Sequence, residues 1–376
     1  MPDVHFNKKE GSKLKLFTPG PVYVPERILK ELAKPNDTHR SKPYSEMHQL
    51  AVEGLKKLLY TKNDCLIFTS SATGIMEACM RNLIKKDEKA LVLSIGAFGN
   101  RWYSVGLANG KNVIKEEVEW GKAITPEFAS EALSKEKYSV VCLQSNETST
   151  GVYNPIDTII PIIKDSGALV CVDATSSMAG TKVEIDKLDI DVCLASVQKC
   201  FALPPGLAVC SISESVIKKA AEVKNRGIYL DFLTIIKKNK VHQTPSTPPI
   251  PQIRGLVAQL DYILTKEGLE SRFQRHKQLG MRTRMWARDA SLEMFPEKGY
   301  ESDTVSTIKN TFNIDYSEMV SQMLMKGYRI VNGYGDLRGK TFRIGHMGEI
   351  TLKDLEEMLE VLTDIISELR LKKLEK

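Results

Sequence analysis

The sequence of 376 residues contains no long hydrophobic run. No stretch approaches the roughly 18 apolar residues that a membrane-spanning helix needs. The first residues, Met1 to Lys15, are polar and rich in lysine, and they lack the apolar segment typical of a signal peptide. We therefore expect a soluble, cytoplasmic protein without a membrane partner.

Charge and cysteine give no sign of a nucleic-acid or metal site. The formal net charge of +6 is small and spread along the chain, which argues against a surface for nucleic acid. The 7 cysteines lie mostly inside apolar runs and without the close spacing of metal ligands. We expect free thiols in the core, as in a reducing compartment, and no bound metal.

Short apolar runs alternate with amphipathic stretches over the first half of the chain. Expected strands are Cys65–Thr69, Ala90–Ile95, Asn112–Val118, Tyr138–Gln144, a run ending at Asp173, one ending near Lys199, and Leu207–Ile212. Expected helices between them are Ile75–Ile84, Asn100–Asn109, Pro126–Ser134 and Pro155–Asp165. Continuous apolar strands separated by helices predict an α/β fold with a mostly parallel sheet that is covered on both faces.

The second half of the chain is predicted to be organised differently. Prolines exclude helix or inner strand from Thr244 to Pro251, so an extended segment is expected there. A long helical stretch from Ile253 to about Ala290 leads into a smaller α+β region. That region ends in an amphipathic helix from Leu352 to Leu371. We expect an N-terminal arm (1–17), a large domain (18–265) and a small C-terminal domain (266–376).

Two charged residues follow apolar runs, Asp173 and Lys199, and Lys199 precedes a Pro204-Pro205-Gly206 turn. Ligands of parallel sheets bind beyond the carboxyl ends of the strands. A lysine and an aspartate at such ends suit pyridoxal 5'-phosphate, which needs an amine for a Schiff base and a carboxylate for its pyridine nitrogen. Taken alone, the pair could equally be two solvated residues at strand ends.

A third strand end carries small hydroxyl residues, in Ser70-Ser71-Ala72-Thr73-Gly74 before a helix. Backbone N–H groups at the positive end of a helix suit a phosphate dianion. An ordinary helix N-cap is the alternative, and the turn by itself does not separate the two.

The ordered motifs resemble those of class V aminotransferases, which are fold-type I pyridoxal-phosphate enzymes, in the branch of alanine–glyoxylate and serine–pyruvate aminotransferases. The resemblance runs from Phe17-Thr-Pro-Gly-Pro21 to Phe342-Arg-Ile-Gly345. Between these lie Ser-Ser-Ala-Thr-Gly, Asn-Glu-Thr-Ser-Thr-Gly, Val-Asp-Ala, Ser-Val-Gln-Lys and Pro-Pro-Gly, in the same order and with similar spacing. The resemblance implies a large domain with a seven-stranded sheet and a smaller α+β domain.

Carried over residue by residue, the resemblance implies a set of cofactor contacts. Lys199 forms the Schiff base and moves the proton between Cα and C4', and Asp173 pairs with the pyridinium nitrogen. Further expected contacts are Ser71, Ala72, Thr73 and Gln198 at the phosphate, Phe98 and Thr175 on the two ring faces, and Ser149 near the phenolic oxygen. Many relatives have tryptophan where this chain has Phe98.

The resemblance also implies a homodimer and a substrate side. Thr247, with Thr244, is expected to reach the phosphate bound by the other subunit. Arg343 is expected to bind the substrate α-carboxylate, because a guanidinium forms bidentate contacts with such a group. Gly20 and Tyr23 are expected on the same side of the pocket. Without the resemblance, Arg343 could be a surface strand residue.

Other activities within the same fold make different demands on the sequence. Phosphoserine aminotransferases carry a His-Arg pair as in His39-Arg40, but Ala72 and Thr73 stand here where that branch has a second arginine. Cysteine desulfurases typically have histidine before the lysine and a cysteine in the C-terminal third, whereas here Gln198 precedes Lys199 and no cysteine follows Cys210. A DNA-binding regulator would need an additional domain.

The sequence therefore predicts a transaminase that moves an amino group from serine or alanine to glyoxylate or pyruvate. Phosphoserine or aspartate as donor, with 2-oxoglutarate as acceptor, is the alternative. Discrimination between such substrates depends on a few contacts in the pocket, and the sequence does not identify them.

Overall fold

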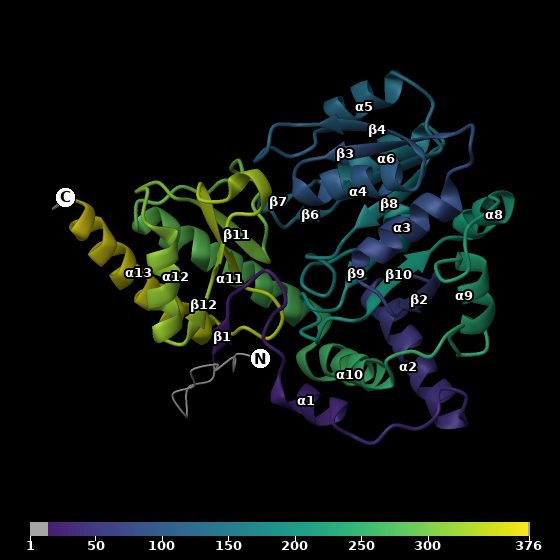
Figure 1. Ribbon diagram of the computed structural model, residues 1–376, viewed down its shortest axis with the longest axis horizontal. Helices are drawn as coiled ribbons and strands as arrows, with labels where there is room; N and C mark the ends of the chain where they lie inside the picture. Colours follow the sequence, from purple (N-terminus) through teal and green to yellow (C-terminus); the bar gives the residue numbers. More distant parts are fainter. Residues whose placement is uncertain (1–13, 375–376) are drawn as a thin grey trace, which may run out of the picture.

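The computed structural model describes residues 14–374, so residues 1–13 of the expected N-terminal arm lie outside the described part. A seven-stranded sheet forms its larger half, in the order β2-β10-β9-β8-β5-β3-β4 (Figure 1). The strands are β2 (Asp64–Phe68), β3 (Lys89–Ser94), β4 (Asn112–Glu117), β5 (Val140–Gln144), β8 (Leu169–Asp173), β9 (Val192–Ser196) and β10 (Ala208–Ile212). β10 is antiparallel to both of its neighbours, and the other pairs are parallel. The predicted α/β fold with a mostly parallel sheet is confirmed.

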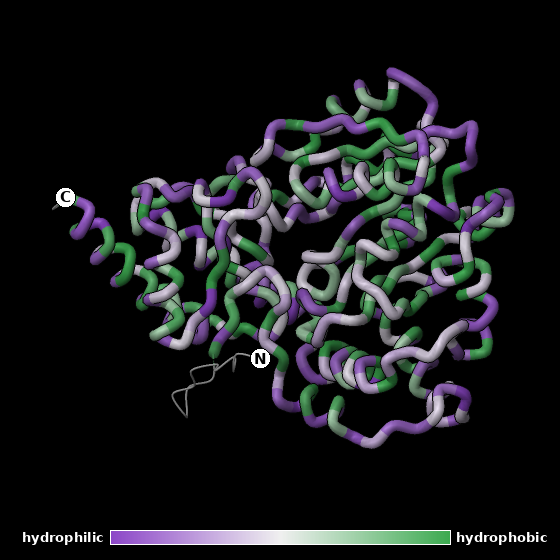
Figure 2. Tube along the Cα trace, viewed as in Figure 1, coloured by the Kyte–Doolittle hydropathy of each residue, from purple (hydrophilic) through white to green (hydrophobic). Residues whose placement is uncertain are grey.

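Helices cover both faces of this sheet because its central strands are apolar on both sides. One face packs on α3 (Ala72–Leu83), α4 (Ala97–Ala108), α8 (Glu214–Glu222) and α9 (Phe232–Asn239). The other face packs on α2 (Lys42–Leu58), α5 (Pro126–Ser134), α6 (Ile156–Asp165) and α10 (Ile250–Asp261). Figure 2 shows the hydrophobic stretches concentrated on the strands and the peripheral loops largely hydrophilic.

A smaller α+β region follows α10 and has its own core. Its three-stranded sheet has the order β11-β14-β13. The elements are β11 (Val305–Lys309), β13 (Val331–Asn332), β14 (Thr341–Gly345), α11 (Leu269–Asp289), α12 (Tyr316–Met325) and α13 (Leu352–Leu374). The start of the described chain joins this region, since β1 (Lys15–Leu16) pairs with β12 (Tyr328–Arg329) and Phe17 is buried in its core. The remaining elements are α1 (Glu26–Leu32), β6 (Asn146–Glu147), β7 (Val152–Tyr153) and α7 (Ile185–Leu188).

One expectation for the middle of the chain is wrong. The segment expected to be extended up to Pro251 already becomes helix at Ile250, because Pro251 lies in the first turn of α10, where the missing N–H is not needed. The long helical stretch expected from Ile253 to about Ala290 is present, but it is interrupted. A turn of π-helix (Tyr262–Glu267) ends at Gly268, whose φ of +81° breaks the helical path before α11.

Other expectations hold. The C-terminal helix buries the apolar face predicted for it: Leu355, Met358, Leu359, Leu362, Ile365 and Ile366. All seven cysteines are free and buried. Within residues 14–374, no helix combines the length and the apolar character that crossing a membrane would require.

Candidate active site

Asp173 and Lys199 meet at one edge of the large sheet. Asp173 is the last residue of β8, and β9 runs parallel beside it with Leu194 opposite Asp173. β9 ends at Ser196, so Lys199 does not end the strand as expected but lies three residues beyond it. There the chain turns, and the N–H of Ala202 donates to the carbonyl of Lys199 at 2.8 Å. The turn points the lysine back over the strand ends, where it is only 8% exposed.

The Lys199 amine is held against the N-terminal Pro19-Gly20 turn. Its Nζ donates a hydrogen bond to the carbonyl of Pro19. Gly20 has a φ of +106°, and a Cβ on it would lie 2.4 Å from Cδ of Lys199, so a larger residue there would displace the lysine side chain. Burial, together with the charge of Arg343, lowers the pKa of Lys199 to about 8, against the opposing effect of Asp173. A fraction of the amine is therefore neutral near physiological pH.

Asp173 is a buried carboxylate with few partners in the protein. It is 3% exposed and accepts a hydrogen bond from the N–H of Thr175 at 2.8 Å. Burial raises its pKa, and Thr175, Lys199 and Arg101 act in the opposite direction. A buried carboxylate is stabilised by a cation placed beside it, so this position favours a positively charged ring nitrogen.

The N-terminus of α3 opens into the same pocket. Ser71 is its N-cap residue, and its hydroxyl makes no capping hydrogen bond to the helix. The N–H of Ala72 donates to Oγ of Ser196 at 2.5 Å, which ties the helix start to the end of β9. Thr73 accepts a 3.4 Å hydrogen bond from Arg101. The hydroxyls of Ser71 and Thr73, a cation and the positive helix end suit a phosphate group.

An aromatic wall closes one side of the pocket. The ring of Phe98 stacks on that of Tyr334, with 5.5 Å between centroids and 16° between planes. Arg101 lies 5.1 Å from the Phe98 centroid, and its Nη2 donates to the Tyr334 hydroxyl at 2.9 Å. Tyr334 follows β13, so this wall joins the large sheet to the C-terminal region.

Ser149 lies behind the pocket, where it supports the start of α4. Its Oγ accepts from the N–H of Ala97 at 3.0 Å and donates to Glu147 at 2.6 Å. Glu147 is fully buried and accepts from the N–H groups of Phe98 and Gly99. Burial raises the pKa of Glu147, against these hydrogen bonds. The pair fixes the loop that carries Phe98.

Arg343 lies next to the pocket, behind Tyr334. Its guanidinium donates to the carbonyls of Asn332 (3.0 Å) and Thr148 (3.2 Å) and lies 5.4 Å from the Tyr334 centroid. Burial lowers its pKa to about 10, so it stays charged at neutral pH. It lines a second cavity that shares Tyr334 with the first.

The proline segment lies away from the pocket within one chain. Arg40 anchors it, donating to the carbonyl of Thr244 at 2.9 Å and to the side chain of Gln243 at 3.0 Å. Thr244 is buried and Thr247 is exposed. Tyr23 is half-buried and does not line the pocket.

The structure thus gathers most of the predicted residues around one pocket and leaves five outside it. Those that line the pocket are Gly20, Ser71, Ala72, Thr73, Phe98, Asp173, Thr175, Gln198 and Lys199. Those outside it are Tyr23, Ser149, Thr244, Thr247 and Arg343. The pocket also includes residues that the sequence did not single out, namely Met76, Arg101, Asn146, Thr148, Ser196 and Tyr334. Arg101 follows Phe98 by one helical turn, a spacing that could have indicated it; Tyr334 had no such signal.

Comparison with known proteins identifies the family. A family model described as aminotransferase class V matches residues 16–315. The chain belongs to this family. Membership of the class V aminotransferases implies dependence on pyridoxal phosphate. The residues of the pocket fit that cofactor. The pocket offers a buried amine in close contact with Gly20, a buried carboxylate, and a helix N-terminus whose Ser71 hydroxyl makes no capping hydrogen bond.

Individual relatives match nearly the whole length of this chain. An uncharacterized aminotransferase of Methanocaldococcus jannaschii is 39% identical over 91% of this chain and 89% of its own length. The serine–glyoxylate aminotransferase of Methylorubrum extorquens is 31% identical over 89% of this chain and 86% of its own. The structure of an aspartate aminotransferase from Thermus thermophilus is 27% identical, with a TM-score of 0.88 over 94% of this chain and 99% of that one.

Proposed function

We propose that this class V aminotransferase uses pyridoxal phosphate to move an amino group from a small amino acid, serine or alanine, to a 2-oxo acid such as glyoxylate or pyruvate. One observation carries the proposal. A buried lysine with a pKa of about 8 shares a pocket with a buried aspartate and the N-terminus of α3. Similarity to serine–glyoxylate aminotransferases supports the choice of substrates.

The residues of the site have distinct roles in the proposed reaction. When bound, pyridoxal phosphate supplies an electron sink that acidifies the Cα–H of an attached amino acid. Lys199 would offer a neutral amine to hold the cofactor, and its Nζ is the group that would accept the proton from Cα of the substrate. Asp173 holds a proton on the ring nitrogen by pairing with it. Ser71, Thr73 and Arg101 bind the phosphate, and Arg343 binds the substrate α-carboxylate.

The link to Lys199 can be tested directly. We expect the protein to bind pyridoxal phosphate and turn yellow, and borohydride to leave the cofactor attached to the peptide that contains Lys199. Lys199→Ala should still bind the cofactor but lose turnover by about 10⁴-fold or more. Lys182→Ala, a change at another lysine of the large half, serves as the control. A colourless protein without a Lys199 adduct would refute the proposal.

The observed contacts of Arg40 favour small donors over phosphoserine. Its guanidinium donates to Gln243, Thr244 and Pro245, so its hydrogen-bonding capacity is used to anchor the proline segment. Aspartate as donor is the second candidate, because the chain is similar to the aspartate aminotransferase of Thermus thermophilus. A matrix of donors and acceptors, assayed by single-turnover absorbance, decides between them.

We further propose that two chains build each site. Thr247 is exposed on the proline segment, and large apolar side chains of the same half of the molecule are exposed as well: Leu50, Ile228, Tyr229 and Val241. Burial of such side chains against a second copy would be favourable, and it would bring Thr247 to that copy's phosphate.

Mixing inactive chains tests this assembly. Heterodimers of Lys199→Ala and Thr247→Ala chains would contain one intact site, so the mixture should exceed both parents in activity. Mixing Lys199→Ala with Asp173→Ala is the control, since there each chain lacks a residue of its own pocket. Activity of the first mixture no higher than its parents would argue that the site is built within one chain.

A further inference from the structure

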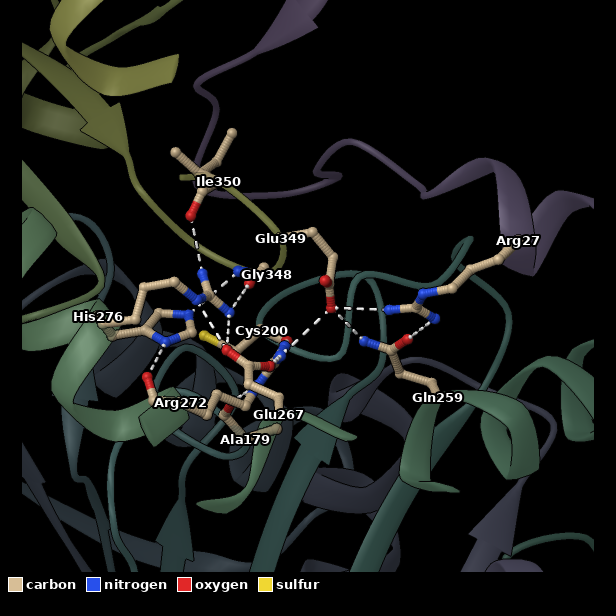
Figure 3. Close-up of polar contacts among 11 residues, drawn as sticks. Arg27, Ala179, Cys200, Gln259, Glu267, Arg272, His276, Gly348, Glu349 and Ile350 are labelled. Carbon is tan, nitrogen blue, oxygen red and sulfur yellow. Dashed lines mark hydrogen bonds and ion pairs between the residues drawn. The ribbon is translucent and has the colours of Figure 1, made fainter. Parts of the chain in front are cut away.

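A buried cluster of charged residues lies behind the pocket, between the large sheet and the C-terminal region (Figure 3). At its centre is Arg272 of α11, whose side chain is completely buried. Glu267 and Glu349 are its ionic partners. A completely buried arginine is rare, and its charge is tolerated only where every donor finds an acceptor.

The guanidinium of Arg272 contacts three separate loops. Nε donates to the carbonyl of Ala179 at 2.7 Å, and Nη2 donates to the carbonyl of Cys200 at 2.6 Å. Nη1 lies 3.2 Å from the carboxylate of Glu349. In Figure 3 these contacts converge on Arg272 from different parts of the chain.

Each of these loops follows a residue of the candidate active site. Ala179 is in the loop after Asp173 and β8, Cys200 is adjacent to Lys199, and Glu349 is in the loop after Arg343 and β14. One planar group therefore links the segments that carry the predicted carboxylate, amine and substrate-binding arginine. Lysine could not replace it, because an ammonium is a single point charge and cannot span three acceptors in fixed directions.

Two of the loops have backbone conformations that need such support. Ala179 has a φ of +66°, and Ala202, in the turn after Lys199, has a φ of +54°. Residues other than glycine rarely adopt this region, and they stay there only when surrounding contacts hold them. The bonds from Arg272 to Ala179 and Cys200 are such contacts.

Neighbouring side chains hold the third loop against the same helix. Arg275 donates to the carbonyls of Gly348 and Ile350, each at 2.8 Å, and Nε2 of His276 accepts from the N–H of Gly348 at 3.2 Å. Glu349 also accepts from Gln259 at 2.7 Å. The loop after β14 is thus fixed to α11 along its length, and Arg272 connects it to the other two.

We infer that Arg272 is a positioning residue, which holds Lys199, Asp173 and Arg343 in register although it touches neither substrate nor cofactor. The inference rests on the proposed function for its consequence in catalysis. Its structural part concerns the placement of Lys199, which can be measured in the cofactor-free chain.

Chemical labelling of Lys199 tests that placement. The cofactor-free full chain is treated with N-hydroxysuccinimide acetate, and acetylation of Lys199 relative to the exposed Lys42 is measured by peptide mass spectrometry. In Arg272→Lys we expect labelling of Lys199 to rise at least about fivefold, because the turn opens locally. Arg282→Lys is the matched control: Arg282 is on the same helix but pairs with Glu356. Equal labelling in wild type and folded Arg272→Lys would overturn the inference.

Kinetics supply the second measurement. With pyridoxal phosphate bound, Arg272→Lys should lose about 10²-fold in kcat from misplaced groups, while cofactor affinity changes far less. If Arg272→Lys does not fold, Glu267→Gln takes its place, since Glu267 orients Arg272, and unchanged labelling there overturns the inference. Labelling needs neither cofactor nor substrate, so a failed transaminase assay would leave its result intact.

Discussion

The two sides of the candidate active site are built in different ways. On the large-sheet side, Asp173 and Lys199 follow neighbouring parallel strands, and α3 begins where β2 ends. On the C-terminal side, Arg343 lies on β14 of a separate three-stranded sheet, and Tyr334 follows its strand β13. Tyr334 lines the pocket, and Arg343 lines the neighbouring cavity. The first side is assembled by sheet geometry, and the second by packing between regions.

This difference shows that the positions of the site residues are fixed by different kinds of contact on the two sides. Strand ends in a sheet are fixed by the hydrogen-bond ladder, so the position of Asp173 follows from the fold itself. Arg343 has no such ladder to the large sheet, and it is placed by single contacts such as the one with the Thr148 carbonyl. We expect changes on the C-terminal side to impair substrate binding, and changes on the sheet side to impair the chemistry.

Among the changes on the C-terminal side, the largest effect is expected for Arg343→Ala. Loss of a desolvated, charge-assisted contact to the α-carboxylate should lower kcat/KM for every amino-acid donor by about 2–4 kcal/mol in transition-state terms. The measurement is steady-state kinetics with several donors. Arg338→Ala is the control, because this exposed arginine lines the same cavity as Arg343. A loss confined to one donor would show that Arg343 contacts the side chain of that substrate and not the α-carboxylate.

Lys199→Met should remove a pH dependence of stability that the wild type shows. The folded-state pKa of Lys199 is about 8, below its ordinary value of 10.5. Between these values the unfolded chain binds more protons, so the free energy of unfolding of the cofactor-free wild type rises with pH. Below a pH of about 8, the buried ammonium of Lys199 destabilises the folded state, by at most about 3 kcal/mol.

Urea denaturation at several pH values measures this effect. The Lys199→Met variant should be more stable than wild type near neutral pH, and the difference should shrink toward pH 10.5. Lys42→Met changes an exposed lysine and should show no such trend. A stability difference that does not vary with pH would mean that burial does not perturb the amine.

Gly20→Ala should displace Lys199 without removing it. The added Cβ would lie 2.4 Å from Cδ of Lys199, and the φ of +106° is unfavourable for alanine. Gly110→Ala is the matched control, with a φ of +63° and nothing within 4 Å of the added atom. Backbone strain alone should cost the control about 1–2 kcal/mol of stability. Only Gly20→Ala should also reduce the borohydride-trapped cofactor; equal trapping in the two variants would contradict the close approach.

The smallest effect is expected for Arg40→Ala. Since Arg40 binds the carbonyls of the proline segment and does not line the pocket, turnover of alanine or serine should change by less than about twofold. Steady-state kinetics with serine, alanine and phosphoserine are the measurement. Efficient phosphoserine turnover that is lost in Arg40→Ala would show that the chain acts on phosphoserine.

The sequence by itself determined the large sheet and the residues at its edge. Continuous apolar strands bury both faces, and their carboxyl ends lie at one edge whatever the details of packing. For that reason Asp173, Lys199 and the start of α3 could be placed from the pattern alone. The turn that carries Lys199 three residues beyond β9, and the helix break at Gly268, were missed because they depend on local backbone conformations with weak sequence signals.

Only the tertiary structure decided what faces these residues. Tyr334 stacks on Phe98, and Arg272 contacts Ala179, Cys200 and Glu349, across large separations in the chain. No periodicity encodes such contacts, because each depends on how two independently formed sheets and the helices between them pack. The sequence could therefore single out candidate groups for the proposed chemistry, whereas their alignment is set by long-range packing.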